Sequence, residues 1–583
     1  MTVPLLRDSQ VDCREWRLPD ALPHIAKQIC LAQSVHPAVS RVLAARGWLA
    51  DERCQAFLNP ELRSLQDPLL MHGMERGVAR TLAAVAASES ILVFGDYDAD
   101  GVTSAAVMVE VLRFLGAAPK VFLPHRIDDG YGMHAPQMQP FANDGVRLII
   151  TVDTGITALE AIARAKELGM DVVITDHHLA GPELPCAEAI INPNVPPQSY
   201  PGGPLCGAGT AFKFAHALLK TSGQEPAKAK AFLMKLLDLV ALGTIADCVP
   251  LWGENRVIAR HGLEALLNSK RPGIQALRKV AKLDDLERLT CQNVGYGIAP
   301  RINATGRLSH PEKALELLTT RCASRATELA EELEALNRER RTEELRILEH
   351  ALAQVEELRA EQLEHGFVLE GEDYHMGVVG IVAARVCEKH YRPCVVLRRE
   401  NGTLRGSARS VPGLDVHAVI TACADLLTRY GGHAQAAGLE LPEENFAEFR
   451  TRFNQIARER FIAEAHKPTL NIDACLQPGE FTWELHKSIQ KLEPFGQDNA
   501  EPVFMLEGVE TVGSPRLVGQ NHLKLQLRYN GVNFSAIGFN KGELLPLCEA
   551  GKLDVAGKLK ENTWQGRVSL ELELLDLRPS GST

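Results

Sequence analysis

Between about residues 76 and 250, short runs of apolar residues alternate with longer stretches in which apolar residues recur every three or four positions. The runs at 91–95, 147–152 and 171–175 are typical of buried strands, and the stretch at 102–116 is typical of a helix. Alternating strands and helices favour βαβ units around a parallel sheet. We therefore predict an α/β domain over residues 76–250.

The pattern changes on both sides of this domain. Residues 1–75 form a lead-in with short helical patterns and no evident chemistry. Residues 251–364 are mainly helical and end in a charged helix from about 323 to 360, whose leucine stripe is interrupted by the sequence NRERRTEE. Because a coiled coil needs several unbroken heptads, we favour a long connector helix between two lobes and keep a coiled coil as the alternative.

Two further domains follow the connector. Residues 365–460 again alternate strand and helix patterns, which predicts a second α/β block. In residues 467–575, apolar and polar positions alternate in HLKLQLRY, VNFSAIGF and VSLELELLDL, a pattern typical of a small antiparallel barrel or sandwich. The predicted fold is thus two α/β lobes joined by a long helix, plus a C-terminal all-β barrel.

Composition restricts the class of protein. The chain has 583 residues, enough for several domains, and its thirteen cysteines include no CxxC pair. No run of about 18 apolar residues suggests a membrane span, and the N-terminus lacks the pattern of a secretory signal. We expect a cytoplasmic protein without membrane attachment. The net charge of −11 disfavours a general nucleic-acid coat but leaves local basic grooves possible.

Acidic residues and histidines follow each predicted strand of the first domain. They are Asp96, Asp98 and Asp100 after the first run, Asp153 after the second, and Asp176, His177 and His178 after the third, with Asp247 after a later apolar helix. The carboxyl ends of parallel strands point into one crevice, so these side chains can converge on a ligand. Clustered carboxylates repel one another unless a cation holds them, and Mg²⁺ and Mn²⁺ prefer carboxylate oxygen.

Each motif alone has an ordinary explanation. The DxDxDG sequence resembles the start of a calcium loop, but Val107 stands where that loop needs a bidentate glutamate, and a strand precedes it. Asp153 alone would more often cap the helix that begins near Thr157, and two adjacent histidines are more often packing residues. The combination is more specific than any of its members.

Taken together, five of these residues would provide a two-metal site with one shared carboxylate: Asp98, Asp100, Asp153, His177 and Asp247. Two divalent cations stabilise both the attacking and the leaving oxygen in a phosphoryl displacement. No GxxxxGK[ST] sequence is present, which disfavours a P-loop NTPase. The predicted reaction class is phosphoester hydrolysis with two Mg²⁺ or Mn²⁺ ions.

The segments GDYDADG, VDTG, DHH and GTIAD, in this order and spacing, resemble the four signature motifs of the DHH phosphoesterase family. PRINATGRL, SARS and GGHAQAAGL further resemble the bacterial exonucleases of that family that degrade single-stranded DNA. The resemblance covers about residues 76–575. It implies a DHH catalytic domain, a DHH-associated domain and an oligonucleotide-binding (OB) fold for the barrel.

The resemblance also implies roles for individual residues. Asp98 and Asp153 would hold one metal, whereas Asp100, Asp153, His177 and Asp247 would hold the other. His178 would contact the scissile phosphate and act in catalysis together with Asp153. Many family members have a histidine at the place of Phe94, so the first metal here would depend on Asp96 or bind more weakly.

A second set of residues matches family positions that handle the DNA backbone and its 5′ phosphate. These are Arg126, Tyr131, Arg301, Arg307, Ser407, Arg409, Gly432 and His433. A guanidinium suits phosphate oxygens, a glycine permits close backbone approach, and a tyrosine can stack on a base. Without the resemblance, each arginine would be read as an ordinary surface residue.

The expected function is therefore a 5′-to-3′ exonuclease that hydrolyses single-stranded DNA to mononucleotides in recombination and repair. One alternative is a DHH phosphodiesterase for short oligoribonucleotides or cyclic dinucleotides, which would lack the barrel. A second is a non-catalytic replication scaffold of the same fold, which the complete set of acids disfavours. The resemblance suggests the single-strand binding protein and a RecQ-type helicase as partners of a monomeric enzyme.

Overall fold

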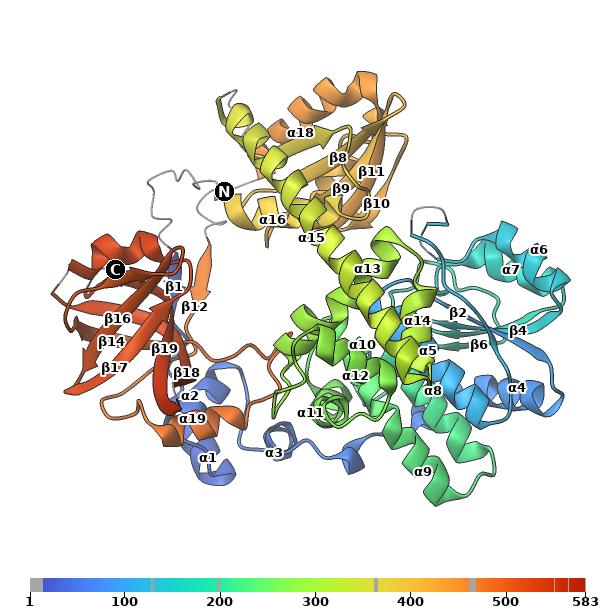
Figure 1. Ribbon diagram of the computed structural model, residues 1–583, viewed down its shortest axis with the longest axis horizontal. Helices are drawn as coiled ribbons and strands as arrows, with labels where there is room; N and C mark the ends of the chain where they lie inside the picture. The colour runs from blue at the N-terminus through green and yellow to red at the C-terminus, as the bar shows by residue number, and fades with distance from the viewer. Residues whose placement is uncertain are drawn as a thin grey trace. The chain divides into compact units, whose positions relative to one another are not determined.

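The structure is a computed structural model that describes residues 14–126, 129–130, 132–196, 200–360, 365–460, 468–549, 551–564 and 566–581. The chain forms two compact units (Figure 1). Unit 1 combines residues 1–60, 467–495 and 499–583, and unit 2 combines residues 61–466 and 496–498. Each unit is described by itself below.

The first lobe of unit 2 is a five-stranded parallel sheet in the order β3-β2-β4-β5-β6. Its strands are β2 (Ser90–Gly95), β3 (Lys120–Phe122), β4 (Val146–Val152), β5 (Asp171–Thr175) and β6 (Ala189–Ile191). Alternate residues of each strand enter different cores, as Val93 and Phe94 do. The sheet is therefore buried on both faces, which explains the uninterrupted apolar runs of its strands.

Helices cover both faces of this sheet. One core contains side chains of α4 (Met74–Ala86), α5 (Ala99–Phe114), α8 (Gly207–Thr221), α9 (Pro226–Lys235) and α10 (Leu237–Ala246). The other core contains side chains of α6 (Ala135–Asn143) and α7 (Leu159–Glu167). Helix α5 begins just after β2 ends, and the first amides of α8 bond to Asp100 in the first turn of α5, so the N-termini of the two helices meet at the carboxyl edge of the sheet.

A helical region extends this lobe toward the second one. It contains α11 (Gly253–Leu267), α12 (Pro272–Val280), the π-helix η3 (Asn293–Ile298), α13 (Ala299–Leu308), α14 (Glu312–Thr319) and α15 (Ala323–Ala360). The N-terminal half of α15 places Leu329 and Leu333 in the first core, and its C-terminal half places Ile347 and Val355 in the core of the second lobe. The interrupted leucine stripe thus reflects two separate cores, and α15 is a connector rather than a coiled coil (Figure 1).

The second lobe of unit 2 is a mixed sheet in the order β10-β11-β9-β8-β7. The strands are β7 (Phe367–Gly371), β8 (Cys394–Glu400), β9 (Thr403–Arg409), β10 (Arg429–His433) and β11 (Ala436–Pro442), with the helices α16 (Val379–His390), α17 (Val416–Thr421) and α18 (Phe446–Arg460). Only the pair β7–β8 is parallel. All five residues of the edge strand β10 are exposed.

Unit 1 is built around a seven-stranded sheet in the order β13-β14-β18-β19-β17-β16-β15, and an added β14–β16 pairing closes it into a barrel. Its strands are β13 (Ala474–Cys475), β14 (Phe504–Thr511), β15 (Arg516–Val518), β16 (His522–Tyr529), β17 (Val532–Gly538), β18 (Leu553–Trp564) and β19 (Arg567–Pro579), and α19 (Trp483–Gln490) lies between the first two in sequence. The predicted barrel is confirmed, but β17 pairs with β19 in parallel, so it is not purely antiparallel.

The N-terminal segment belongs to the barrel and not to the catalytic lobe that follows it in sequence. Strand β1 (Glu15–Arg17) pairs with β12 (Thr469–Asn471), and Trp16 Nε1 donates to Asp576 at 2.8 Å. The helices α1 (Pro23–Gln33), α2 (Pro37–Ala45) and α3 (Glu52–Leu58) share one hydrophobic core with the barrel. The lead-in predicted over residues 1–75 is therefore divided between the two units. The helices before residue 60 are buried against barrel strands more than 400 residues away, whereas Met71 and Met74 lie in the core of the first lobe of unit 2.

The fold class predicted from the sequence is confirmed: two α/β lobes, a long connecting helix and a C-terminal barrel. Among the described residues, no helix is long and apolar enough to cross a membrane. Every described cysteine is a free thiol.

The shared core of unit 1 predicts that its N-terminal helices and barrel unfold together. Leu43→Ala removes a fully buried side chain from this core and should lower the free energy of unfolding by about 2 to 5 kcal/mol. Four of the five tryptophans, at positions 16, 48, 483 and 564, fall in unit 1, so denaturation followed by tryptophan fluorescence reports on it. The matched control is Leu31→Ala, since Leu31 is largely exposed. Loss of α1–α3 in a transition separate from that of the barrel would contradict the shared core.

Candidate metal centre and phosphate-binding cluster

The first acidic motif forms the turn between β2 and α5. Asp98 is the N-cap of α5, and its Oδ1 accepts hydrogen bonds from Asp100 N at 2.9 Å and Gly101 N at 3.0 Å. Asp96 Oδ1 accepts from Tyr97 N at 2.8 Å. Gly101 packs so tightly on the backbone of Asp96 that a Cβ would lie 2.5 Å from its carbonyl oxygen. Capping and close packing together fix the directions of these carboxylates.

Asp100 points to the N-terminus of α8. Its Oδ2 accepts from Gly207 N at 2.6 Å, and its Oδ1 accepts from Ala208 N at 2.9 Å. Burial and the nearby charge of Asp98 raise the pKa of Asp100 to about 6, although the helix amides and the Cys206 thiol favour the ionised form. Two backbone amides thus orient a buried carboxylate.

Asp153 occupies a strained backbone position at the end of β4. Its φ of 60° is in the left-handed region, which non-glycine residues rarely adopt. The residue is buried, and among the described residues its Oδ1 accepts no hydrogen bond, although the His177 ring lies nearby. Gly207 packs beside it, where a Cβ would lie 2.5 Å from Oδ1. A strained residue with an orphaned buried oxygen is typical of a functional site.

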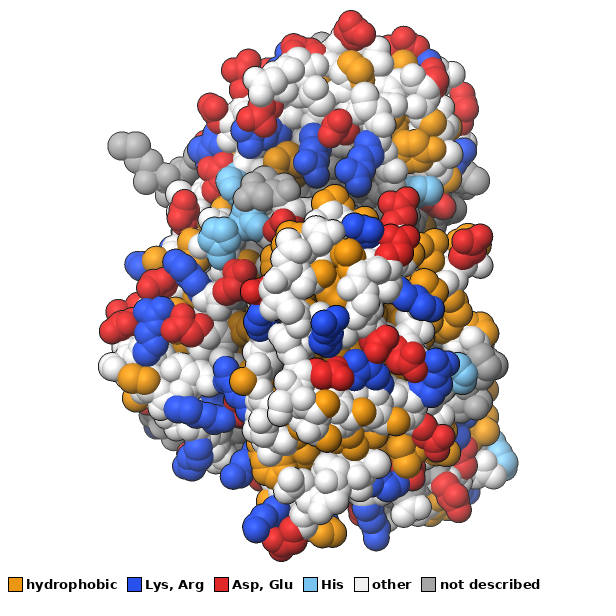
Figure 2. Space-filling view, turned by 90° about the vertical axis from the view of Figure 1, so that its right-hand side faces the viewer, with side chains coloured by type: hydrophobic (Ala, Val, Ile, Leu, Met, Phe, Trp, Pro, Cys, Tyr) orange, Lys and Arg blue, Asp and Glu red, His pale blue; other side chains and the backbone are white. Residues whose placement is uncertain are grey.

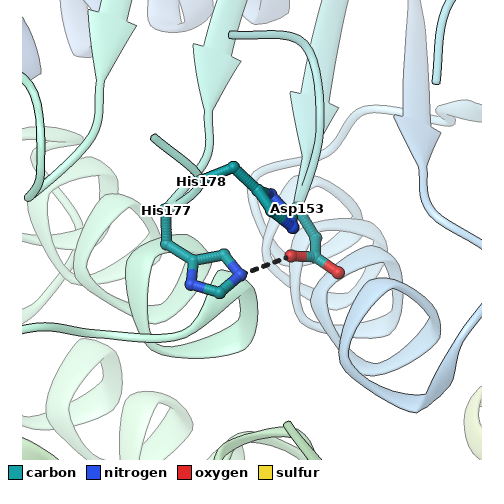
Figure 3. A group of neighbouring side chains, drawn as sticks. All are labelled: Asp153, His177 and His178. Carbon is teal, nitrogen blue, oxygen red and sulfur yellow. Dashed lines mark ion pairs between the residues drawn. The ribbon is translucent and has the colours of Figure 1, made fainter. Parts of the chain in front are cut away.

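His177 lies near three separate carboxylates, and Figure 3 shows its approach to one of them, Asp153. Its Nε2 lies 3.1 Å from Asp153 Oδ1, 3.7 Å from Asp247 Oδ2 and 3.9 Å from Asp100 Oδ2. Burial and the charge of His178 lower the pKa of His177 to about 4, so its imidazole is neutral at pH 7. A neutral imidazole among three carboxylates is a suitable metal ligand.

His178 has the opposite charge state. Its Nδ1 lies 2.7 Å from Asp176 Oδ1, and Asp176 also accepts from the backbone amides of His177, His178 and Ile156. Burial alone would lower the pKa of His178, but the hydrogen bond and charge of Asp176 raise it to about 9. An imidazolium cannot coordinate a metal, so His178 is suited to donate a proton from its other ring nitrogen to an anion.

The carboxylates raise one another's pKa values. Burial and Asp98 raise the pKa of Asp96 well above its usual range, burial and Asp100 do the same for Asp153, and burial with Asp100 raises the pKa of Asp247 to about 9. Two groups consist of candidate ligand atoms that lie within 4.8 Å of one another: Asp96, Asp98 and Asp153; and Asp100, His177 and Asp247. A third such group joins Asp153 and His177 to His178, whose charge excludes it as a ligand. The donors are carboxylate oxygens and imidazole nitrogens, so the set fits Mg²⁺ or Mn²⁺.

Phe94 takes no part in this cluster. It is fully buried and stacks on Phe122, with ring centroids 5.3 Å apart, in the core opposite α5. Asp96, two residues later, instead has a carboxylate oxygen within 4.8 Å of carboxylate oxygens of Asp98 and Asp153.

Three arginines from separate elements lie close together beside the cluster. Arg126 follows β3 and its guanidinium lies 5.3 Å from the ring centre of Tyr97. Burial and the charges of Arg126 and Arg340 lower the pKa of Arg307, on α13, to about 10. Burial and Arg126 also lower the pKa of Arg409, on β9. Cations held this close to one another favour an anionic ligand.

The second lobe adds small and polar groups near these arginines. Gly380, near the start of α16, packs against β9 so that a Cβ would lie 3.1 Å from Arg409 Nη2 and 3.3 Å from Ser407 Oγ. Cross-strand pairing aligns Arg409, Ala436 and His433 in one row. Gly432 has φ 143°, and a Cβ there would lie 2.4 Å from Ala436 O. In Figure 2, histidine, lysine and arginine side chains lie around the boundary between the rounded upper part of this face and the larger part below it.

One of the DNA-contact predictions disagrees with the surroundings of its residue, and another falls outside the described residues. Arg301 is buried, and its guanidinium donates to the carbonyls of Gly297 and Val280 and pairs with Glu334, so it holds the π-helix in place and has no room for a phosphate. Tyr131 lies outside the described residues. Arg126, Arg307 and Arg409 lie near one another, and Ser407, Gly432 and His433 lie in the same sheet as Arg409, whereas their contacts with DNA stay predictions.

Sequence reasoning missed the residues that support the ligands. Asp176 orients His178, and Cys206, Gly207 and Ala208 surround Asp100. Gly243 also belongs here, because a Cβ would lie 2.7 Å from Asp100 Oδ1. The glycine-rich run CGAG before an apolar helix was a usable signal, since such runs often bring backbone amides to an anion.

Comparisons with known proteins agree with this geometry. Residues 90–244 match the DHH family N-terminal domain, residues 363–459 the DHHA1 domain and residues 472–576 the RecJ OB domain. The chain is 35% identical over 566 residues to the single-stranded-DNA-specific exonuclease RecJ of Escherichia coli, covering 94% of this chain and 97% of that protein. It is 37% identical over 553 residues to the RecJ of Bacillus subtilis, covering 94% of this chain and 69% of that protein.

A solved structure is similar over nearly the whole chain. The crystal structure of RecJ from Thermus thermophilus in complex with Mn²⁺ has 31% sequence identity and a TM-score of 0.83, covering 98% of this chain and 81% of that one. A second structure from the same organism contains Mg²⁺, with a TM-score of 0.77. Both ions are those that the donor set here fits.

The crowded carboxylates predict opposite effects of one substitution on the metal-free and metal-loaded protein. Asp153→Asn removes a buried charge, so the metal-free protein should melt at a higher temperature. The substitution also removes a carboxylate that belongs to two of the groups of candidate ligand atoms. The stabilisation of the protein by Mn²⁺ should therefore largely disappear. Thermal unfolding with EDTA and with Mn²⁺ measures both, and Asp144→Asn, at an exposed position, is the control. An unchanged Mn²⁺-induced shift would contradict the assignment.

The two histidines should differ in metal binding. His177→Ala should weaken Mn²⁺ binding, because a neutral ligand is lost, whereas His178→Ala should leave the affinity nearly unchanged, because an imidazolium is no ligand. Isothermal titration calorimetry with Mn²⁺ on both variants and the parent protein measures the difference. Equal losses of affinity in the two variants would refute the separate roles.

Proposed function

The chain belongs to the RecJ family of DHH phosphoesterases, and from this we propose that it is a metal-dependent exonuclease that hydrolyses single-stranded DNA from the 5′ end to mononucleotides. The observation that carries the proposal is the cluster of three arginines beside a cluster of buried carboxylates. The first fits a terminal phosphate, and the second fits the cations that hydrolysis of the adjacent bond requires. DNA recombination and repair are the processes that would need this activity.

The residues divide the chemical tasks. Asp98 and Asp153, with Asp96, would hold one divalent ion, and Asp100, Asp153, His177 and Asp247 would hold the other. The ions, when bound, supply activated water and neutralise charge on the phosphate. The His178 imidazolium, oriented by Asp176, would donate to a phosphate oxygen and stabilise the negative charge that develops there.

Polarity would come from the second lobe. Ser407, Arg409 and the backbone near Gly432 would bind the 5′ phosphate, with Arg126 and Arg307 along the adjacent backbone. This arrangement would place the first phosphodiester at the metal centre, and cleavage there releases one nucleotide. His433 shares a cross-strand row with Arg409 and would contact the next phosphate.

The alternative activity, on short oligoribonucleotides or cyclic dinucleotides, is less well supported. Those substrates are only a few nucleotides long, and their hydrolysis does not require a barrel that matches the RecJ OB domain. Barrels of this type bind single strands through stacking and cationic grooves, which suits long DNA.

Partners and compartment follow from the substrate. Single-stranded DNA must be exposed by other proteins, so we propose the single-strand binding protein and a RecQ-type helicase as partners of a monomeric enzyme. We propose the cytoplasm as its compartment, in agreement with the free thiols of the described cysteines.

A panel of end-labelled substrates tests the activity. With Mn²⁺ or Mg²⁺, labelled single-stranded DNA should yield mononucleotides from its 5′ end, whereas blunt duplex DNA and short RNA should remain largely intact, and EDTA should stop the reaction. Product release from the 3′ end, or faster cleavage of dinucleotides than of long DNA, would refute the proposal.

Arg409 should determine the preference for a 5′ phosphate. Arg409→Ala should slow cleavage of 5′-phosphorylated strands more than of strands with a 5′ hydroxyl, because a charge-assisted contact contributes about 1.5 to 3 kcal/mol, or roughly one to two powers of ten. The matched control is Arg405→Ala, an exposed residue of the same strand. Steady-state kinetics on the two substrates separate the roles, since an equal loss on both would indicate a structural arginine.

A further inference from the structure

The amide of Ala99 lies between two metal ligands and is bonded by a distant residue. Ala99 N donates to Asn303 Oδ1 at 2.7 Å, and Ala99 is 1% exposed. Asn303 is on α13, and it belongs to the PRINATGRL segment, in which only the arginines had received a role.

This bond completes the N-terminus of α5. Asp98 Oδ1 accepts the next two amides, those of Asp100 and Gly101, so the first three amides of the helix are satisfied by two side chains. Without Asn303, the buried Ala99 amide would need another acceptor, and the Asp98 carboxylate is the neighbouring one. A carboxylate turned toward Ala99 would no longer be aligned for a cation.

A second contact of α13 reaches the same turn. Gly306 packs against the carbonyl of Tyr97, where a Cβ would lie 2.6 Å from the oxygen. The next residue, Arg307, donates from Nη1 to Gly377 O at 2.8 Å in the segment that precedes α16. The helix α13 therefore packs against the acidic turn and also carries Arg307, one of the three clustered arginines.

We propose that Asn303 is a positioning residue of the metal centre, which holds Asp98 and Asp100 in the geometry that binds divalent cations. The proposal deepens the proposed function, since it concerns the same metal site. Asn303 does not itself coordinate an ion, and its effect passes through the backbone of the acidic turn.

Two substitutions at this position separate positioning from general stability. Asn303→Ala removes the acceptor, whereas Asn303→Asp keeps an acceptor oxygen at the same place. Asn268→Ala is the control. Asn268 is exposed, and within the described part of the chain its side chain donates to the carbonyl of Glu264 and makes no bond to the acidic turn. Calorimetric titration of the whole protein with Mn²⁺ in the absence of DNA measures the affinity, and thermal unfolding in EDTA measures stability.

Asn303→Ala should weaken Mn²⁺ binding about 10- to 100-fold, as is usual for residues that orient metal ligands. Asn303→Asp and Asn268→Ala should bind Mn²⁺ at least as well as the parent protein. In hydrolysis of single-stranded DNA, Asn303→Ala should lower kcat at limiting Mn²⁺, recover with more Mn²⁺, and leave KM for DNA unchanged.

Parent-like Mn²⁺ affinity in Asn303→Ala would overturn the proposal, as would an equal loss in Asn303→Asp. If Asn303→Ala proves too unstable to titrate, the Asn303→Asp result alone decides, since a preserved acceptor must preserve the affinity. Because Mn²⁺ is titrated without DNA, failure of the exonuclease assay would not be confused with failure of this proposal.

Discussion

The structure of the catalytic lobe depends on the repulsion among carboxylates that are buried together at the ends of parallel strands. Asp96, Asp100, Asp153 and Asp247 all have raised pKa values, because burial disfavours each charge and the neighbours add to the effect. Nothing in the backbone can relieve this repulsion fully. The surrounding protein instead orients the carboxylates toward common points, through the N-termini of α5 and α8 and the strained backbone of Asp153. Divalent cations supply the missing positive charge.

Charge of the opposite sign lies in the neighbouring cluster. Arg126, Arg307 and Arg409 come from three different elements, and burial together with the charge of Arg126 lowers the pKa values of both Arg307 and Arg409. Under the proposed function, a nucleic-acid strand would satisfy both clusters at once, with a terminal phosphate at the arginines and the scissile phosphate at the cations. The net charge of −11 therefore conceals a local cationic site. Whole-chain charge says little about binding when the relevant groups are few and concentrated.

Long-range packing produced the features that sequence reasoning did not find. The N-terminal helices carry apolar faces whose partners lie in the C-terminal barrel, and no local pattern reveals a partner so distant in sequence. Arg301 illustrates the same limit for a single residue. Its position in a motif suggested a phosphate contact, whereas the carbonyls of Gly297 in the π-helix and of Val280 at the end of α12 bind its guanidinium.

The sequence by itself determined the alternation of strands and helices, the long connector and the set of acidic residues and histidines that converge at the candidate metal centre. It could do so because apolar periodicity follows from burial, and because acids placed after successive parallel strands must meet at one edge of the sheet. Only the tertiary structure decided which residues hold those ligands in place. Gly207 and Asn303 act through single hydrogen bonds between elements far apart in the chain, and Asp176 acts through several bonds that include its neighbours His177 and His178; such contacts leave no periodic trace in the sequence. The charge states of His177 and His178 were likewise decided by burial and neighbours, since adjacent identical residues differ only in what surrounds them.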